Sequence, residues 1–247
     1  MSTKPEFIIV PGAWHPPSSF DPTTSLLRNA GFTTHGITLP SYGASPPLKS
    51  FDPDVLAIRH VLEKLLSSGK DVVMIFHSYG GVVGCEALKE YVDGGEKEGW
   101  GKVRRLVFVA AFVLPVGGSL MATLGGEPLP WFEIDGDVLN PANPQEIFYN
   151  DLTPSAAAPH IAALKQHSYP TLASKLTTAP WKTIPSTYIL CEKDNAIPLQ
   201  GQEGMIAGAR EEAPEAFDVV ERCEAGHSPF LSKPEWLAGK LVESASR

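Results

Sequence analysis

The 247-residue sequence predicts an α/β fold built on a mostly parallel, doubly wound sheet. Two observations lead to this fold class. Short apolar segments typical of buried strands alternate along the chain with segments of helical periodicity, an order typical of parallel sheets with helices on both faces. Residues 72–76 (VVMIF) are apolar without interruption, as expected of a central strand that is buried on both faces.

The strands and helices of this sheet can be placed along the chain. The expected strands are residues 6–10, 33–39, 71–76, 105–112, 187–191 and 217–220. The expected helices are residues 22–30, 54–67, 82–91 and a last helix that starts near Pro234. The helix at 54–67 is the clearest, because its apolar residues recur at positions i, i+3, i+4 and i+7, the spacing of a helix with one buried face.

Residues 114–184 interrupt the alternation of strands and helices. This segment contains nine prolines, no continuous apolar strand, and short helical pieces such as residues 155–166. A connection of about 70 residues is too long for an ordinary loop. We therefore expect a core domain of residues 1–113 and 185–247 with an inserted helical cap at 114–184.

Composition excludes several classes of partner. The formal net charge is −8, and Lys and Arg are scattered along the chain, which argues against nucleic acid and against an anionic membrane. The three cysteines form no CxxC motif or Cys/His cluster, so neither a metal site nor a disulfide framework is indicated. No apolar run of about 7–15 residues follows a basic start at the first residues, and no apolar run reaches about 18–20 residues. We expect a cytoplasmic protein without a cofactor; its oligomeric state, a homodimer included, is open.

Ser78 lies at the corner between an apolar strand and a run of small residues, in the stretch VVMIFHSYGGVVG. Such a corner can be a purely structural turn, or it can hold a nucleophile on a strained elbow. Serine is a poor nucleophile unless a base takes its proton and an acid orients that base. A catalytic Ser78 therefore predicts an acid and a histidine, each beyond the carboxyl end of a later strand, where functional loops collect.

Two residues meet this requirement. Asp194 lies in the turn after the strand at 187–191 and is preferred to Glu192, which is too close to the strand. His227 lies on the loop between the last strand and the last helix. The chain order of serine, acid and histidine is the order of α/β-hydrolases and of no other serine-triad fold considered. Taken together, these positions favour a catalytic Ser78.

An oxyanion hole requires two backbone N–H groups near the nucleophile. Tyr79, the residue after Ser78, is expected to supply one, and Ala13 the other, since Gly12 permits a tight bend after the first strand. The aromatic residues of the insertion are expected mostly in its own core, with some in the substrate pocket. The candidates for substrate binding are Gly12, Trp14, His15, Trp131, Phe148 and Trp181.

With these residues in place, the chain resembles α/β-hydrolases over nearly all of its length. Within that superfamily it is similar to the plant methylesterase and hydroxynitrile lyase group and its microbial relatives. The stretches that carry the resemblance are FIIVPGAWH, VVMIFHSYGGVVG, RLVFVAAF, YILCEKDNAIP and GHSPFL. The resemblance implies Ser78 as nucleophile, Asp194 as orienting acid and His227 as base, with Ala13 and Tyr79 as oxyanion donors.

The chain departs from these relatives in several places. Pro11 replaces the usual His before Gly12, and Phe76 replaces the small residue that usually stands two positions before the nucleophile. The phenyl ring must therefore find room against a neighbouring helix or strand. The lyases of the group carry a Lys after the catalytic His and a Thr in the oxyanion loop, whereas this chain has Ser228 and Gly12. These differences favour hydrolysis over lyase chemistry.

The sequence thus predicts a cofactor-independent serine hydrolase. It would cleave an ester, thioester or lactone of a small, largely apolar molecule through an acyl-enzyme on Ser78. Two alternatives remain open. A lyase would use the same triad as a base to cleave a C–C bond, and a receptor on the same fold would bind a small molecule without turnover.

Overall fold

Six parallel strands form the central sheet of the computed structural model, which describes residues 4–93 and 97–247. Their order across the sheet is β2-β1-β3-β4-β8-β9. The pairs β1/β3 and β4/β8 are therefore neighbours in the sheet although they are not consecutive strands of the chain. The strands are β1 (Glu6–Val10), β2 (Thr34–Gly36), β3 (Val72–His77), β4 (Val103–Val109), β8 (Ser186–Cys191) and β9 (Val219–Cys223). This arrangement confirms the predicted parallel, doubly wound sheet.

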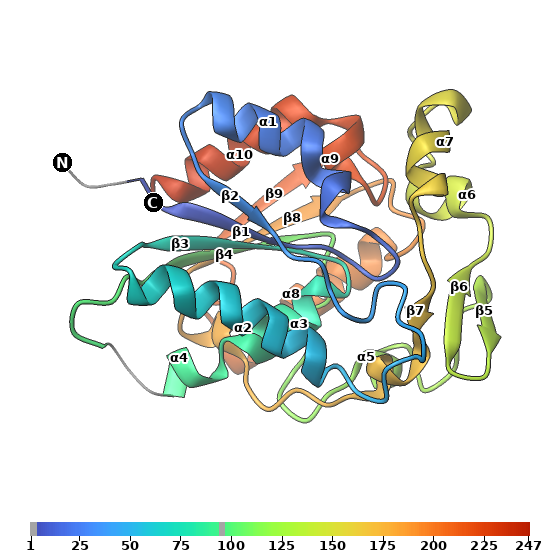
Figure 1. The fold of residues 1–247 in the computed structure, drawn as a ribbon, viewed down its shortest axis with the longest axis horizontal. Coiled ribbons are helices and arrows are strands. Elements are labelled where there is room, and N and C mark those ends of the chain that lie inside the picture. The colour runs from blue at the N-terminus through green and yellow to red at the C-terminus, as the bar shows by residue number, and fades with distance from the viewer. Residues whose placement is uncertain (1–3, 94–96) are drawn as a thin grey trace.

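Helices cover both faces of the sheet (Figure 1). One face carries α1 (Asp21–Asn29), α9 (Pro229–Ser232) and α10 (Pro234–Ala245), and the other carries α2 (Asp52–Ser67), α3 (Gly80–Ala87) and α8 (Leu199–Glu212). Alternate residues of β3 therefore pack into two different cores, Val73 and Ile75 on the α1 side and Met74 and Phe76 on the α2 side. Burial on both faces explains why β3 is apolar throughout.

Several elements differ from the expected bounds. The helix expected at 82–91 is divided at Leu88 into α3 and α4 (Lys89–Asp93). The last strand starts at Val219 because Phe217 has a φ of 55° and the carboxylate of Asp218 accepts two 2.8 Å hydrogen bonds from Arg105. Helix α8 was not predicted, since its three glycines lower its helix propensity.

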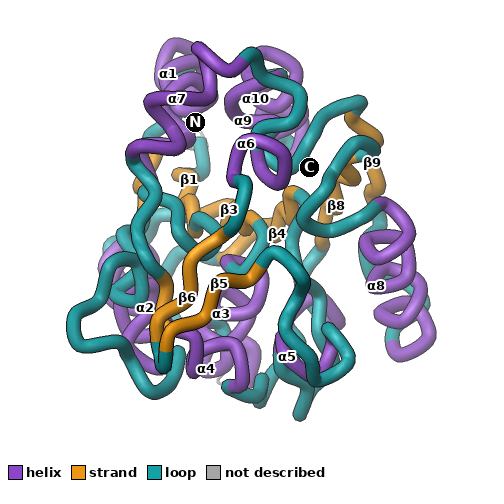
Figure 2. The backbone as a smooth tube through the Cα atoms, turned by 90° about the vertical axis from the view of Figure 1, so that its right-hand side faces the viewer, coloured by secondary structure: helices purple, strands orange, loops and turns teal. Residues whose placement is uncertain are grey.

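The insertion contains a small sheet besides the expected helical pieces. Strands β5 (Phe132–Asp135), β6 (Val138–Pro141) and β7 (His167–Ser168) are antiparallel. The short helices are η1 (Pro17–Phe20) before α1 and, in the insertion, α5 (Leu120–Thr123), α6 (Pro144–Phe148), α7 (Pro154–Ala162), η2 (Tyr169–Ala173) and η3 (Pro180–Lys182). The small sheet escaped prediction because β5 is mostly exposed and lacks an apolar run. Figures 1 and 2 show β5, β6, α6 and α7 together at the carboxyl end of the parallel strands. The domain boundaries at 114 and 184 stay a prediction.

The ring of Phe76 finds its space against helix α3. It packs edge-on against Phe108, with ring centroids 5.1 Å apart. On its other side lies Gly84, where a Cβ atom would approach Phe76 Cε1 to 2.3 Å. A bulky residue two positions before Ser78 is thus accommodated because the facing position of α3 has no side chain.

This complementarity predicts that Gly84→Ala destabilises the protein. A methyl group at this position overlaps the buried ring, and overpacking of this kind costs about 1–3 kcal/mol. Urea denaturation measures the change in the free energy of unfolding. Gly208→Ala is the matched control, because a Cβ there meets nothing within 4 Å; it is expected to be neutral or to stabilise helix α8 by about 0.5–1 kcal/mol. Adding Phe76→Leu should recover part of the loss, and equal stability of Gly84→Ala and wild type would contradict this account.

Candidate active site

Ser78 occupies a strained turn between β3 and α3. Its φ is 52°, in the left-handed region that non-glycine residues rarely adopt. The carbonyl of Ser78 accepts hydrogen bonds from Gly81 N at 3.0 Å and from Phe112 N at 3.1 Å. A Cβ on Gly80 would lie 2.4 Å from the carbonyl oxygen of Val10, and one on Gly81 2.3 Å from that of Phe112. The two glycines that follow the serine are therefore required by the backbone packed against the elbow.

Asp194 and His227 form a buried pair near this elbow. Asp194 follows β8 and His227 follows β9, and His227 Nδ1 lies 2.8 Å from Asp194 Oδ2, with side chains 1% or less exposed. The other carboxylate oxygen of Asp194 accepts the backbone N–H groups of Ala196 and Ile197 at 2.7 and 2.9 Å. Asp194 therefore holds the imidazole by Nδ1 and leaves Nε2 for other chemistry. Within the described residues no hydrogen bond joins His227 and Ser78 Oγ.

His77 supports the loop that carries His227. Its Nε2 lies 2.9 Å from the carbonyl oxygen of His227, and since a carbonyl only accepts, His77 Nε2–H is the donor. Complete burial lowers the pKa of His77 well below its ordinary value, with a smaller effect from the neighbouring His227 and His15. His77 is thus a neutral structural residue.

The first loop lies directly against the elbow. A Cβ on Gly12 would come within 2.9 Å of Ser78 Cβ and 3.0 Å of His77 Nδ1. Glycine at this position therefore lets the backbone of Gly12 and Ala13 approach the nucleophile. The next residue, Trp14, has a φ of 65° and is anchored by a 2.9 Å hydrogen bond from its Nε1 to the carbonyl of Leu139.

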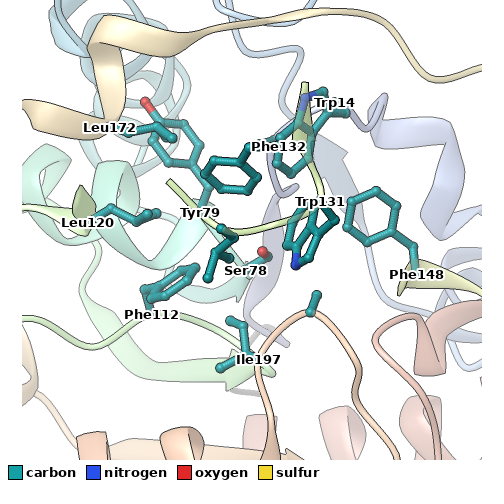
Figure 3. Close-up of a pocket in the computed structure, with 13 residues that line it drawn as sticks. Trp14, Ser78, Tyr79, Phe112, Leu120, Trp131, Phe132, Phe148, Leu172 and Ile197 are labelled. Carbon is teal, nitrogen blue, oxygen red and sulfur yellow. The ribbon is translucent and has the colours of Figure 1, made fainter. Parts of the chain in front are cut away.

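An apolar pocket opens at Ser78 (Figure 3). The space between its lining atoms, open solvent included, is about 360 Å³. Ser78 Oγ is the one lining hydroxyl that faces it, since the Tyr79 hydroxyl points away toward helix α2. The pocket is lined by Ala13, Trp14, Ser78, Tyr79, Phe112, Leu120, Leu129, Trp131, Phe132, Phe148, Leu172, Ala196 and Ile197. No charged side chain belongs to this lining.

Comparisons with known proteins show the family of the chain. Residues 7–240 match the family model described as the alpha/beta hydrolase family. The chain belongs to this family. It is 35% identical to the alpha/beta hydrolase nvfD of Aspergillus novofumigatus, covering 98% of this chain and 97% of that protein. It is 24% identical to methylesterase 7 of Arabidopsis thaliana over 100% of this chain and 98% of the relative. A crystal structure of a pyrethroid hydrolase superposes with a TM-score of 0.79 at 21% identity, covering 99% and 98% of the two chains.

The predicted substrate-binding residues of this α/β-hydrolase divide into two groups. Trp14, Trp131 and Phe148 line the pocket, while Gly12, His15 and Trp181 do not. Gly12 lies behind Ala13 against the elbow. Trp181 precedes β8 and stacks on Phe217, so it lies toward the amino ends of the strands, away from the site.

His15 is a buried support of the first loop rather than a contact for substrate. Its Nδ1 lies 2.7 Å from the carbonyl oxygen of Ala13, and its Nε2 lies 2.9 Å from the hydroxyl of Tyr149 in the insertion. The carbonyl fixes Nδ1 as the donor, so Nε2 accepts from the tyrosine. Burial lowers the pKa of His15 to about 4, which keeps this arrangement neutral near pH 7.

The insertion also holds the loops that carry Asp194 and His227. Asn150 Nδ2 donates to the carbonyl of Lys193 at 2.8 Å, and Asp151 Oδ2 accepts from Gly226 N at 2.7 Å. These two side chains were not singled out in the sequence, because a polar residue in a loop gives no signal of its distant partner. The pocket residues Phe112, Leu120, Leu129 and Leu172 were not singled out either, whereas Phe132 is one of the aromatic residues of the insertion that were expected in part in the pocket. Ala196 and Ile197, also missed, adjoin Asp194 in sequence and could have been found from that position.

Two further features are absent from residues 4–93 and 97–247. No group of three or more His, Cys, Asp and Glu side chains suits a metal ion there. In the same residues, no helix has the length and apolar character needed to cross a bilayer.

Gln202 on helix α8 was also missed, and it braces the turn that carries Asp194. The side chain is completely buried. Its Oε1 accepts from Cys191 N at 3.0 Å, and its Nε2 donates to the carbonyls of Cys191 and Ile197 at 3.0 and 2.7 Å. One side chain thus satisfies three backbone groups that flank Asp194.

We therefore predict that Gln202→Leu, which conserves the volume but not the hydrogen bonds, lowers the free energy of unfolding by at least about 2 kcal/mol, because buried backbone groups lose their partners. Gln200→Leu on the exposed part of the same helix is the control and should change stability by less than about 0.5 kcal/mol. Chemical denaturation of both variants decides the matter. Equal stability of the two variants would show that the bonds of Gln202 are dispensable.

Proposed function

We propose that this α/β-hydrolase is a serine hydrolase that cleaves an ester, thioester or lactone bond of a small, neutral and largely apolar molecule. One observation carries the proposal: Ser78 stands on a left-handed elbow and faces an apolar pocket, while the buried Asp194–His227 pair lies beyond the ends of β8 and β9. Backbone strain of about 1–3 kcal/mol persists where function requires it. Esterase-type relatives, such as methylesterase 7, support the same reaction class.

In the proposed reaction Ser78 Oγ attacks the carbonyl carbon while His227 Nε2 takes the hydroxyl proton. Asp194 accepts from Nδ1–H and stabilises the imidazolium that forms. The oxygen of the attacked carbonyl becomes negative and accepts hydrogen bonds from the N–H groups of Ala13 and Tyr79. Collapse of the tetrahedral intermediate breaks the bond to the leaving oxygen or sulfur, which receives the proton from His227. Water, deprotonated by His227, then attacks the acyl-enzyme and releases the acid and Ser78.

The contact between Ser78 Oγ and His227 forms a part of this proposal. Catalytic hydrogen bonds are often long in the absence of substrate and shorten in the complex. Gly12 holds the first loop against Ser78, and the Asp194 carboxylate fixes the orientation of the imidazole. Ser78 is therefore held by close packing and the His227 imidazole by a hydrogen bond, and neither contact depends on substrate.

The lining of the pocket supports a neutral substrate. Transfer of a charged group into surroundings without a compensating partner is costly, and the lining offers no charged side chain. The large rings of Trp14, Trp131 and Phe148 offer apolar contact instead. The cytoplasmic location stays a prediction from the sequence, and whether the protein forms a homodimer stays open.

The test is a time course of p-nitrophenyl acetate and p-nitrophenyl butyrate hydrolysis combined with mass detection of acyl adducts after rapid quenching. We expect Ser78→Ala to lower kcat by about 10⁴-fold or more and to remove the adduct, since the nucleophile is lost. Ser67→Ala, an exposed serine of helix α2, is the matched control and should behave as wild type. A folded wild-type protein with neither turnover nor adduct would refute the proposal and favour a lyase, which needs no acyl-enzyme, or a receptor.

A further inference from the structure

Asp54 is a buried carboxylic acid outside the Asp194–His227 pair. It lies in the first turn of helix α2 and its exposed area is zero. One of its oxygens, Oδ1, accepts from Ser41 N at 2.8 Å, and the other, Oδ2, accepts from the hydroxyl of Tyr79 at 3.0 Å. An acidic residue in the first turn of a helix is favoured by the helix dipole, but the exposed Asp52 already provides that. The dipole therefore does not explain why Asp54 is buried.

Burial of this carboxyl group is unfavourable unless its partners compensate. Desolvation raises the pKa of Asp54, and the hydrogen bonds from Ser41 and Tyr79 oppose that rise. Replacing all members of a buried polar or ionic cluster together by well-packed apolar residues of similar volume is often neutral or stabilising. Stability alone therefore does not explain the buried carboxyl group of Asp54. Its hydrogen bond with Tyr79, the residue after Ser78, indicates a role in the active site.

Tyr79 connects this carboxylate to the reacting atoms. It follows Ser78, so its backbone N–H is one of the proposed oxyanion donors, and its ring lines the pocket. Figure 3 shows the side chain running away from Ser78, and its hydroxyl ends on Asp54. The ring edge also packs against His167 of β7, with centroids 4.7 Å apart. The residue that supplies the proposed oxyanion donor is thus held at its far end by a buried hydrogen bond to Asp54.

A fixed side chain at position 79 matters because the elbow is strained. The left-handed φ of Ser78 persists only while the surrounding contacts enforce it. On one side of the elbow Gly12 and Val10 block movement of the chain. On the other side, the carbonyl of the Ser78–Tyr79 peptide accepts two backbone hydrogen bonds, and the hydrogen bond to Asp54 holds the far end of the Tyr79 side chain.

We propose that Asp54 is a positioning residue that acts through the Tyr79 hydroxyl to hold the Tyr79 N–H in the direction of the developing oxyanion. Asp54 itself does not touch substrate. This inference rests on the proposed function, since it requires that an oxyanion forms at Ser78. It adds a second buried carboxylate to the site, with a task separate from that of Asp194: Asp194 orients the base, and Asp54 orients a donor.

The experiment compares Tyr79→Phe, Asp54→Asn and the double variant with wild type, using p-nitrophenyl butyrate and a phenyl-substituted trifluoromethyl ketone. The ketone forms a tetrahedral adduct with a serine nucleophile and places its oxyanion in the hole. Tyr79→Phe keeps the ring and the N–H and removes only the hydroxyl. Loss of a whole oxyanion donor costs about 10²–10³ in kcat, so a misdirected donor is expected to lower kcat by about ten- to hundredfold with KM within about twofold of wild type.

Three further readouts separate positioning from general damage. Affinity for the ketone should fall by the same factor as kcat, because both depend on the oxyanion contact. The double variant should be no slower than the slower single variant, since both substitutions remove the same hydrogen bond. Two controls, Tyr42→Phe, which removes a hydroxyl bonded to the Ala163 carbonyl, and Asp52→Asn in the same helical turn, should keep wild-type kcat.

The two proposals can fail independently. A wild type that forms the adduct on Ser78, together with a folded Tyr79→Phe that retains wild-type kcat and ketone affinity, would overturn the positioning role and leave the serine hydrolase intact. Additive losses in the double variant would overturn it as well. Absence of any adduct on Ser78 in wild type would overturn the hydrolase proposal and the role of Asp54 with it. Thermal denaturation of each variant identifies an unfolded protein, and Tyr79→Phe serves as the decisive variant if Asp54→Asn does not fold.

Discussion

The left-handed backbone at Ser78 is the constraint on which the rest of the site depends. A φ of 52° at a residue with a side chain is unfavourable by itself, so the neighbouring backbone must leave no alternative. Gly80 and Gly81 permit Val10 and Phe112 to pack directly against the turn. The carbonyl of Ser78 accepts two N–H groups as a consequence. The strain is thus balanced by hydrogen bonds and close packing from β1, the segment after β4 and the start of helix α3.

The first loop also contains a residue with an unfavourable positive φ that surrounding contacts hold in place, in this case the aromatic Trp14. Trp14 also has a positive φ, of 65°, and its ring lies within 5.9 Å of Trp131, Phe132, Phe148 and His167, measured between centroids. All four rings belong to the insertion. Aromatic contacts of this kind each contribute about 0.5–1.5 kcal/mol beyond burial, and together they fasten the loop that carries Ala13. The insertion therefore supports the loop that carries Ala13 and also lines the pocket.

Polar contacts add to this support at the other end of the insertion. Asn150 and Asp151 hold the loops that carry Asp194 and His227, and Tyr149 holds His15 in the first loop. The loops that bear Asp194, His227 and Ala13 are in this way tied to residues 149–151. A site whose supports are independent of substrate is preorganised, and preorganised dipoles stabilise a developing charge without reorganisation.

The sequence by itself determined the parallel sheet, the elbow at Ser78, and the identity of the paired Asp194 and His227. Each of these leaves a local pattern: apolar runs in strands buried on both faces, glycines at a tight turn, and polar residues just beyond strand ends. Tertiary structure alone decided which side chains meet across long separations. Trp181 was expected in the pocket because it is aromatic, yet it packs against Phe217 near the amino ends of the strands, away from the pocket. Asp54 and Tyr79, 25 residues apart, meet because helix α2 lies beside the elbow. Contacts of this kind follow from how helices and the insertion pack on the sheet, and a periodic pattern within one segment carries no information about its distant partner.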